Sequence, residues 1–375
     1  MKYNKKTILF ILAGFGLGGI ERHLVKQMQK FDINKYSFHL AVLYQKPEEP
    51  ELYDDLPSHV TVHKLHITRF YSPFYLRKLY KTIKSVDPDI VVTSTFTPNT
   101  MATILKPFFT YKIITREHNV YDSIKKTKHR IIDHISTYFA DRVVCVSKMV
   151  AENEIKKRWG HRRKFLVIHN GVQIPQKQIG AKEARKILQK EYKIDTTSNI
   201  LLNVARLMPQ KNQTLLIDAF ELFYKKHPNS YLFILGEGPE REKLEKLIKE
   251  KKLQKHIILC GSRSNVDMFY ASADISILTS DIEGFPNVAV ESLAYDTPLV
   301  TTKVGGVVEY IQNGKQGCLV DRKPRNVADG IECMLQDMRA RPKEIKKACI
   351  NTAKRFTIEK NVEKYENLFK ELLEK

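Results

Sequence analysis

Short apolar segments alternate with amphipathic ones along this chain of 375 residues, and that alternation constrains the fold more than any other feature. It favours parallel sheets whose strands are joined by helices. The segments predicted as strands in the first half are Thr7–Ala13, Ser37–Tyr44, Ile90–Thr93, Lys112–Thr115, Arg142–Val146 and Phe165–His169. Those predicted in the second half are Ile200–Ala205, Tyr231–Leu235, Ile257–Cys260, Ile275–Leu278 and Leu299–Thr302. The sequence therefore predicts an α/β protein.

A polar segment with proline and glycine, Gln173–Gly180, separates the two runs of this pattern. A chain of this length forms two domains more often than one. We therefore expect two doubly wound domains, residues 1–175 and 176–357, that face each other across a central cleft. Residues 358–375 carry apolar residues at helical spacing, and we expect this last helix to pack back on the first domain. Ligands of such sheets bind at the carboxyl ends of the strands.

The net charge of +21 is unevenly distributed. Residues 1–180 hold 30 Lys and Arg against 15 Asp and Glu, whereas residues 181–375 hold 33 against 27. A basic first half indicates an anionic partner such as a membrane surface, a phosphorylated ligand or nucleic acid, although a solvated lysine-rich surface explains it as well. The chain lacks any helix-turn-helix, RRM or zinc module, which disfavours nucleic-acid binding.

The cysteines and the amino terminus both favour a cytoplasmic protein. The five cysteines are scattered without ligand spacing, which is typical of free thiols in a reducing compartment. The basic and apolar start resembles a signal peptide, but its apolar run is short and leads into a glycine loop, so we predict a first strand instead. No segment is long and apolar enough to span a bilayer.

The segment Ser280–Ser292 is the strongest candidate for a ligand site. Gly284, Phe285 and Pro286 predict a tight turn, and Asn287–Tyr295 a short helix. The backbone N–H groups at the start of that helix can bind an anion, which the helix dipole also favours. Glu291 lies one turn inside the helix, where a carboxylate suits the paired hydroxyls of a ribose. Glu283 precedes the turn and can reach another part of the same ligand, so a nucleotide diphosphate sugar satisfies all three groups.

Two further loops of the second half follow predicted strands. Arg206 and Lys211 emerge where a strand ends and a helix begins, and two cations there can neutralise a diphosphate leaving group. They can equally be surface cations of a basic chain. The glycines of Leu235–Glu240, Gly236 and Gly238, allow the backbone to approach a flat or anionic ligand closely, although such turns are common between strands and helices.

The first half offers weaker candidates. The loop with Gly16, Gly18 and Gly19 follows the first strand, but its spacing G-x-G-x-G-G departs from a dinucleotide fingerprint, so we expect a flexible loop that binds acceptor or phosphate. His118 follows another strand and is either a structural residue or a group that contacts a donor sugar or moves a proton. Asp87-Pro-Asp89 precedes a strand instead of ending one, so we expect no metal there.

The segment Arg69–Lys84 mixes aromatic residues with cations. Phe74, Leu76, Leu79, Tyr80 and Ile83 approximate one helical stripe. The pattern is typical of an interfacial membrane helix and also of an ordinary amphipathic core helix.

Together these segments resemble the retaining glycosyltransferases of family 4, whose two Rossmann-like domains form the GT-B fold. The resemblance covers nearly the whole chain and is strongest in residues 199–321. The segments that carry it are Gly18–Glu21, His118, Ser147, Asn170–Val172, Arg206…Lys211, Gly236–Glu240, Gly261…Asp274, Glu283/Glu291, Thr302–Glu309 and Asn313…Gly317.

The resemblance implies a role for each candidate residue. Arg206 and Lys211 resemble the clamp on the donor diphosphate, assisted by the turn Gly284, Phe285, Pro286 and Asn287. Glu291 resembles the ribose-binding carboxylate, and the loops with Gly236, Gly238 and Ser262 are expected to hold the ribose or base. The catalytic pair implied is Glu283, facing the transferred sugar, and His118, whose usual acidic neighbour is replaced by Asn119. Similar enzymes use no metal or other cofactor and retain the anomeric configuration.

The function implied is transfer of a hexose or N-acetylhexosamine from a nucleotide sugar, with UDP favoured, to a lipid-linked or polysaccharide acceptor. The product would be a bacterial surface glycan such as a capsule, O-antigen or teichoic or teichuronic acid. We expect the protein to be cytoplasmic and peripherally bound to the inner leaflet of the cytoplasmic membrane. Alternatives are a sugar-nucleotide epimerase or a phosphorylase on the same fold and, more remotely, a basic nucleic-acid-binding protein.

Overall fold

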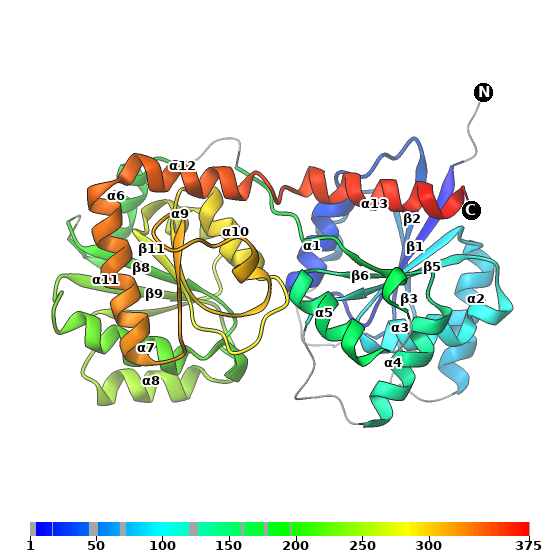
Figure 1. The fold of residues 1–375 in the computed structure, drawn as a ribbon, viewed down its shortest axis with the longest axis horizontal. Helices are drawn as coiled ribbons and strands as arrows, with labels where there is room; N and C mark the ends of the chain where they lie inside the picture. The colour runs from blue at the N-terminus through cyan, green and yellow to red at the C-terminus, as the bar shows by residue number, and fades with distance from the viewer. Residues whose placement is uncertain are drawn as a thin grey trace. The chain divides into compact units, whose positions relative to one another are not determined.

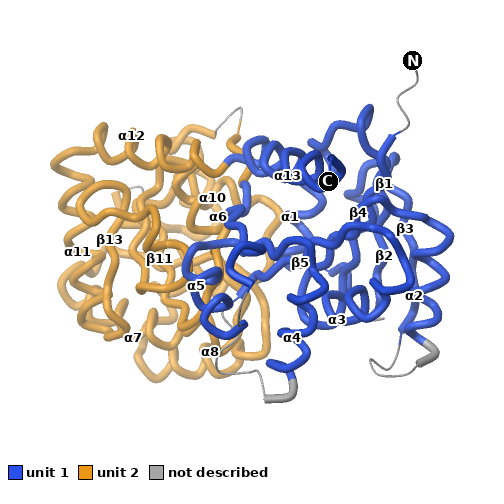
Figure 2. Tube along the Cα trace, turned by 45° about the vertical axis from the view of Figure 1, so that its right-hand side comes forward, with its two compact units in different colours: residues 1–171, 357–375 blue, residues 172–356 orange. Residues whose placement is uncertain are grey.

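The computed structural model describes residues 5–16, 18–44, 52–67, 73–119, 127–158, 161–175, 179–195 and 197–374, except the side chains of 73–74 and 127–128. Within it the chain divides into two compact units (Figure 2), residues 1–171 with 357–375, and residues 172–356. The expected boundaries were 175/176 and 357/358. Each unit contains one parallel sheet covered by helices (Figure 1). The predicted α/β class with two Rossmann-like domains is confirmed, while the cleft between them stays a prediction.

The first unit is built on a seven-stranded sheet in the order β3-β2-β1-β4-β5-β6-β7. Its strands are β1 Lys6–Leu12, β2 Tyr36–Val42, β3 Val60–Lys64, β4 Ile90–Ser94, β5 Lys112–Glu117, β6 Arg142–Cys145 and β7 Phe165–Val167. Its helices are α1 Gly19–Met28, α2 Pro73–Val86, α3 Phe96–Leu105, α4 Thr127–Phe139, α5 Lys148–Lys157 and α13 Ile358–Leu373, with 3-10 turns η1 Tyr53–Asp55, η2 Lys106–Phe108 and η3 Arg162–Lys164.

One face of this sheet forms a core with α1 and α13. Side chains of β1 alternate between faces, so that Ile8, Phe10 and Leu12 point into this core. Val362, Tyr365, Leu368, Phe369 and Leu372 of α13 complete it. The last helix therefore packs on the first unit, at the apolar positions that its spacing predicts.

The second unit has a six-stranded sheet in the order β10-β9-β8-β11-β12-β13. Its strands are β8 Asn199–Val204, β9 Ser230–Leu235, β10 Ile257–Gly261, β11 Ile275–Leu278, β12 Leu299–Thr302 and β13 Gly317–Val320. Its helices are α6 Ala181–Tyr192, α7 Gln213–Tyr224, α8 Arg241–Glu250, α9 Val266–Ser272, α10 Asn287–Ala294, α11 Pro324–Ala340 and α12 Pro342–Ala353, with 3-10 turns η4 Pro209–Lys211 and η5 Gly305–Glu309.

The aromatic and basic segment 69–84 falls partly on α2, and its residues 69–72 lie outside the described part of the chain. Leu79 and Ile83 of the predicted stripe are fully buried. The Tyr80 ring packs 5.0 Å from the ring of Phe109, between centroids. The described part of the stripe thus belongs to the packing of the first unit, which favours the core-helix interpretation over the interfacial one.

Candidate active site

The candidate residues of the second unit gather at the carboxyl edge of its sheet. Its first strand, β8, lies in the middle, with β9 on one side and β11 on the other. From β8 the chain continues to β9 on one side, and from β11 it continues to β12 on the other. This change of direction creates the topological switch point where open α/β sheets bind ligands. Arg206 and Lys211 follow β8, and Glu283 follows β11. The structure therefore brings together the two loops that the sequence analysis singled out.

Lys211 and Glu283 form an ion pair across the switch point. The Lys211 Nζ lies 2.5 Å from Glu283 Oε1, and both side chains are largely buried. The Ser280 hydroxyl donates to the same carboxylate oxygen at 2.7 Å. Burial strengthens such a pair, because little water screens it. A carboxylate fixed by two donors is thus held beside a cation at the expected ligand edge.

The loop after β8 is held in place by its neighbours. Gln213 Nε2 donates to the Arg206 carbonyl at 3.0 Å. Asn212, in the left-handed region, caps α7 by accepting from Leu215 N at 3.2 Å. The Arg206 residue itself is exposed. The Arg206 backbone is therefore fixed, while Arg206 as a whole remains accessible to solvent.

The turn before α10 is held by η5. Gly306 N donates to the Gly284 carbonyl at 2.8 Å. Gly305 has φ +49°, and a Cβ there would come within 2.4 Å of the Glu283 carbonyl oxygen. Only glycine permits this close approach without displacing the backbone that carries Glu283.

In the turn expected to bind diphosphate through backbone donors, one residue lacks the donor. Pro286 has no N–H and cannot donate, so its part is to precede the helix with a fixed φ of −73°. Phe285 is buried, with its ring 5.6 Å from Tyr310 and 5.3 Å from Phe356, between centroids. Its side chain anchors the turn. Gly284 and Asn287 flank this anchor at the start of α10.

Glu291 lies on α10, one turn beyond its start, and is half-buried. The Tyr270 hydroxyl of α9 lies 3.5 Å from Glu291 Oε2 and donates to the Val288 carbonyl at 3.3 Å. Burial, and then the Glu291 carboxylate, raise the pKa of Tyr270 well above its usual value. A neutral tyrosine therefore helps to hold the carboxylate on the helix.

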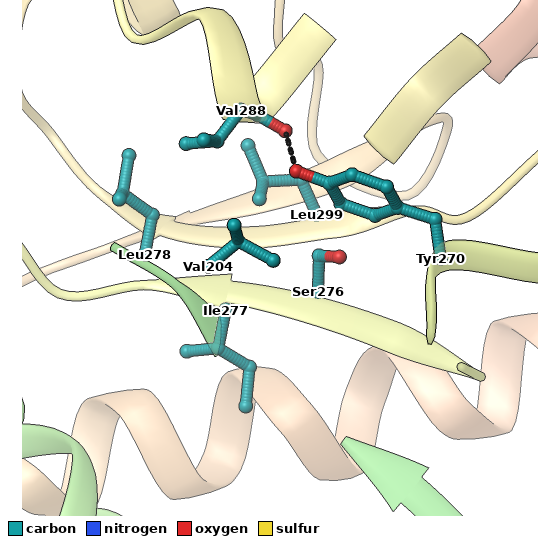
Figure 3. A pocket seen from close by; sticks show the side chains of 7 residues that line it. All are labelled: Val204, Tyr270, Ser276, Ile277, Leu278, Val288 and Leu299. Carbon is teal, nitrogen blue, oxygen red and sulfur yellow. Dashed lines mark hydrogen bonds between the residues drawn. The ribbon is translucent and has the colours of Figure 1, made fainter. Parts of the chain in front are cut away.

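A cavity of about 10 Å³ lies beneath α10 (Figure 3). It is lined by Val204, Tyr270, Ser276, Ile277, Leu278, Val288 and Leu299. A volume of this size holds at most one water molecule. It belongs to the packing of α10 on the sheet and is too small for a nucleotide.

The glycine loop after β9 is joined to the loop after β8. Leu207 N donates to the Glu237 carbonyl at 2.9 Å, and Gly236 N to the Gly261 carbonyl at 2.9 Å. Gly236 has φ +135°, and a Cβ there would lie 2.0 Å from the Ala205 carbonyl oxygen. Gly236 is thus required by the contact between loops, and Gly238 follows in the same loop. Ser262 is exposed just after β10, so the loops form a continuous row along the edge.

His118 follows β5 of the first unit and is buried. Burial, and then Arg116, lower its pKa well below the usual value. The ring is therefore neutral at physiological pH. Its Nε2 has no hydrogen-bond partner among the described residues. Gly16, Gly18 and Gly19 lie after β1, whose carboxyl end is separated from that of β5 only by β4.

Sequence reasoning missed a buried polar network next to His118. Arg116 is 1% exposed, donates to Gln27 Oε1 at 3.4 Å, and lies 5.3 Å from the centre of the Tyr365 ring. Gln27 Nε2 donates to Asn361 Oδ1 at 2.6 Å. The signal available was an arginine inside an apolar strand, but its partners on α1 and α13 are too distant in sequence to be assigned.

The described residues contain no group of three or more His, Cys, Asp or Glu side chains that could hold a metal ion. Asp89 lies at the amino edge of the first sheet, where its Oδ2 accepts from Thr7 N at 2.8 Å and its Oδ1 pairs with Lys6 at 2.9 Å. Its carboxylate therefore caps the start of β1. No helix among the described residues is long and apolar enough to cross a membrane.

Comparisons with known proteins bear on the family and on the fold. The family model described as Glycosyl transferases group 1 matches residues 184–356, and the model described as Glycosyltransferase Family 4 matches residues 17–175. An uncharacterised glycosyltransferase of Methanocaldococcus jannaschii is 29% identical over 69% of this chain and 65% of its own length.

A Campylobacter jejuni enzyme named N-acetylgalactosamine-N,N'-diacetylbacillosaminyl-diphospho-undecaprenol 4-alpha-N-acetylgalactosaminyltransferase is 26% identical, over 93% of this chain and 94% of its own. Among solved structures, Anabaena HepE in complex with UDP-glucose superposes with a TM-score of 0.84. That match covers 97% of this chain and 99% of HepE. At 19% identity it shows similarity of the fold alone.

Proposed function

Because the chain belongs to the group 1 glycosyltransferases of family 4, we propose that it moves a hexose or N-acetylhexosamine from a nucleotide diphosphate sugar to a growing glycan. The observation that carries the proposal is the Lys211–Glu283 pair at the switch point of the second sheet. A cation and a carboxylate there match the two ends of a donor, its diphosphate and its transferred sugar.

The ion pair suggests how the donor engages the site. An incoming diphosphate competes with Glu283 for Lys211, because it offers more negative charge to the same ammonium group. Arg206, exposed on the same loop, adds a second cation. Glu283 keeps its hydrogen bond from Ser280 and faces the sugar, where a carboxylate stabilises positive charge developing at the anomeric carbon.

The remaining donor contacts follow from α10 and the edge loops. Glu291 binds the ribose hydroxyls, and the loops with Gly236, Gly238 and Ser262 border the base. His118, neutral because it is buried, donates to or accepts from a sugar hydroxyl. Transfer proceeds with retention of configuration and without a metal, as the resemblance implies, and the leaving phosphate takes the acceptor proton.

The acceptor is a lipid-linked or polysaccharide glycan of a bacterial surface polymer, and a UDP-sugar is the favoured donor. Support comes from the names of similar proteins. The Campylobacter relative acts on a diphospho-undecaprenol saccharide, another relative is a capsular polysaccharide glycosyltransferase of Staphylococcus aureus, and HepE was solved with UDP-glucose. A cytoplasmic location at the membrane accords with this acceptor and with five free cysteines.

A thermal-shift panel of UDP-, GDP- and ADP-sugars tests the donor. A ligand present at one hundred times its Kd adds about 2.7 kcal/mol of stability, a shift that is easily measured. We expect a UDP-sugar to give the largest shift. A flat response to every donor would contradict the proposal.

Product analysis then separates transferase from epimerase. The donor that shifts melting is incubated with and without a lipid-linked saccharide extract. A transferase forms a longer saccharide only when the acceptor is present. Conversion of the nucleotide sugar into another nucleotide sugar without acceptor would identify an epimerase instead.

A further inference from the structure

Helix α4 of the first unit turns its apolar face to solvent and its polar face inward, the reverse of an ordinary surface helix. Its outward face carries Ile131, Ile135, Tyr138 and Phe139, which are 60%, 48%, 62% and 38% exposed. Their spacing places them along one side of the helix. Asp133, Ser136 and Thr137 point inward and are buried.

The reversal has a cause inside the first unit. Arg158, 3% exposed, pairs with Glu117 and Glu154 at 2.7 Å each and with Asp133 at 3.7 Å. Its Nη1 also donates to Thr137 Oγ1 at 3.0 Å. Buried charges need such partners, so α4 is held to the fold through its polar face. The apolar face stays largely exposed, although the Tyr138 ring lies 5.9 Å from the ring of His161, between centroids.

Exposed apolar side chains concentrate in this region. Of the ten large hydrophobic residues exposed within the described part of the chain, six belong to α3, η2 and α4. They are Ile104, Phe108, Ile131, Ile135, Tyr138 and Phe139. Helices α3 and α4 are neighbours (Figure 1). A cluster of exposed apolar side chains of this kind is typical of an interaction surface.

Within α4 and η3, the exposed charged side chains that the structure describes have one sign. Arg130 of α4 and Arg162 and Arg163 of η3 are exposed. Lys164 Nζ donates to the Tyr138 carbonyl at 2.5 Å, which holds η3 against the end of α4. Asp133 is the one acidic residue within the described side chains of these two elements, and it is turned inward.

We propose that α4 and η3 form the surface through which the protein binds an anionic membrane. The apolar face enters the boundary between headgroups and acyl chains, while the arginines of η3 contact lipid phosphates. A second copy of the chain is a poorer fit, since a self-complementary contact would bring the same cations together. This inference rests on the proposed function, because membrane binding would bring a lipid-linked acceptor to the enzyme.

Flotation of the full-length protein with vesicles tests the surface. We expect binding to vesicles of phosphatidylcholine with phosphatidylglycerol and little binding to phosphatidylcholine alone. The variant Ile135→Ser/Tyr138→Ser should bind at least about tenfold more weakly, because two large apolar side chains no longer enter the membrane. Arg162→Ala/Arg163→Ala should lose about fivefold for each cation.

Matched controls come from exposed residues of the second unit. Ile187→Ser removes an isoleucine that is 40% exposed on α6, and Lys246→Ala/Lys255→Ala removes two exposed lysines. Both should bind vesicles as the wild type does. The proposal would be overturned if the wild-type protein did not bind anionic vesicles, or if the α4 variants bound them as the wild type does.

Two further readouts separate this inference from the proposed function. If Ile135→Ser/Tyr138→Ser converts a dimer into a monomer in light scattering, the face is a protein interface and the membrane proposal is wrong. Donor-induced thermal shifts should be the same in the α4 variants and the wild type. Vesicle binding together with a flat donor panel would leave the surface standing and reject the glycosyltransferase site.

Discussion

At the scale of single residues, the candidate site depends on side chains whose neighbours suppress or pair their charges. The sequence located Glu283 and Lys211 at strand ends but not their ion pair, because the two residues lie 72 positions apart and meet only through the sheet order. It also could not foresee that Phe285 would be an anchor, since an aromatic residue in a turn can point either way.

The buried histidines predict a pH dependence of stability. Burial, followed by Arg116, lowers the pKa values of His23 and His118. An unfolded histidine ionises near pH 6.5, so below that pH the unfolded chain binds more protons than the folded one. Stability should therefore fall on acidification from about pH 7, by up to about 1.4 kcal/mol for each pH unit and histidine, until the folded pKa is passed.

Urea unfolding at pH 7 and pH 5 measures this effect. His118→Asn should lose less stability between the two values than the wild type, because one of the two buried groups is gone. His59→Asn, at an exposed position, is the matched control and should behave as the wild type does. Equal losses in all three proteins would show that burial of His118 does not govern the acid response.

At the scale of elements, most strands could be predicted, and the omissions share a cause. Ile275–Leu278 and Leu299–Thr302 agree with the structure to the residue. β3 and β13 were missed because both are short edge strands with little continuous apolar sequence, and β13 begins with a glycine. The buried polar face of α4 also escaped prediction, since its partner Arg158 lies beyond the next strand.

The contact between η5 and the turn before α10 predicts the effect of one methyl group. In Gly305→Ala the new Cβ would meet the Glu283 carbonyl oxygen, at a φ that alanine adopts only at a cost of roughly 1–2 kcal/mol. We expect the turn to shift and donor affinity to fall, with a melting temperature lowered by a few degrees.

Gly180→Ala is the matched control for that variant. Among the described residues, no atom lies within 4 Å of a Cβ added at Gly180, whose φ is −63°. Its donor affinity should equal that of the wild type. If Gly305→Ala also binds donor normally, then η5 does not position Glu283.

At the scale of the whole molecule, the two sheets share one feature of their topology. In each, the first strand lies inside the sheet and the chain reverses direction beside it, between β1 and β4 and between β8 and β11. The candidate residues cluster after these strands because ligands of open α/β sheets bind there. Periodicity could predict this feature, whereas the sugar, the base and the acceptor depend on a few hydroxyl contacts that periodicity does not encode.

Donor affinity, measured by titration calorimetry with the UDP-sugar that the panel selects, tests the central claim most directly. Lys211→Ala should weaken binding roughly tenfold to a hundredfold, as expected when a charged hydrogen bond is lost, and Glu291→Ala should act in the same direction. Glu283→Gln should keep or raise the affinity, because the diphosphate then no longer competes with a carboxylate for Lys211, and Lys246→Ala should change nothing. Wild-type affinity in both Lys211→Ala and Glu291→Ala would contradict a donor site at the switch point of the second sheet.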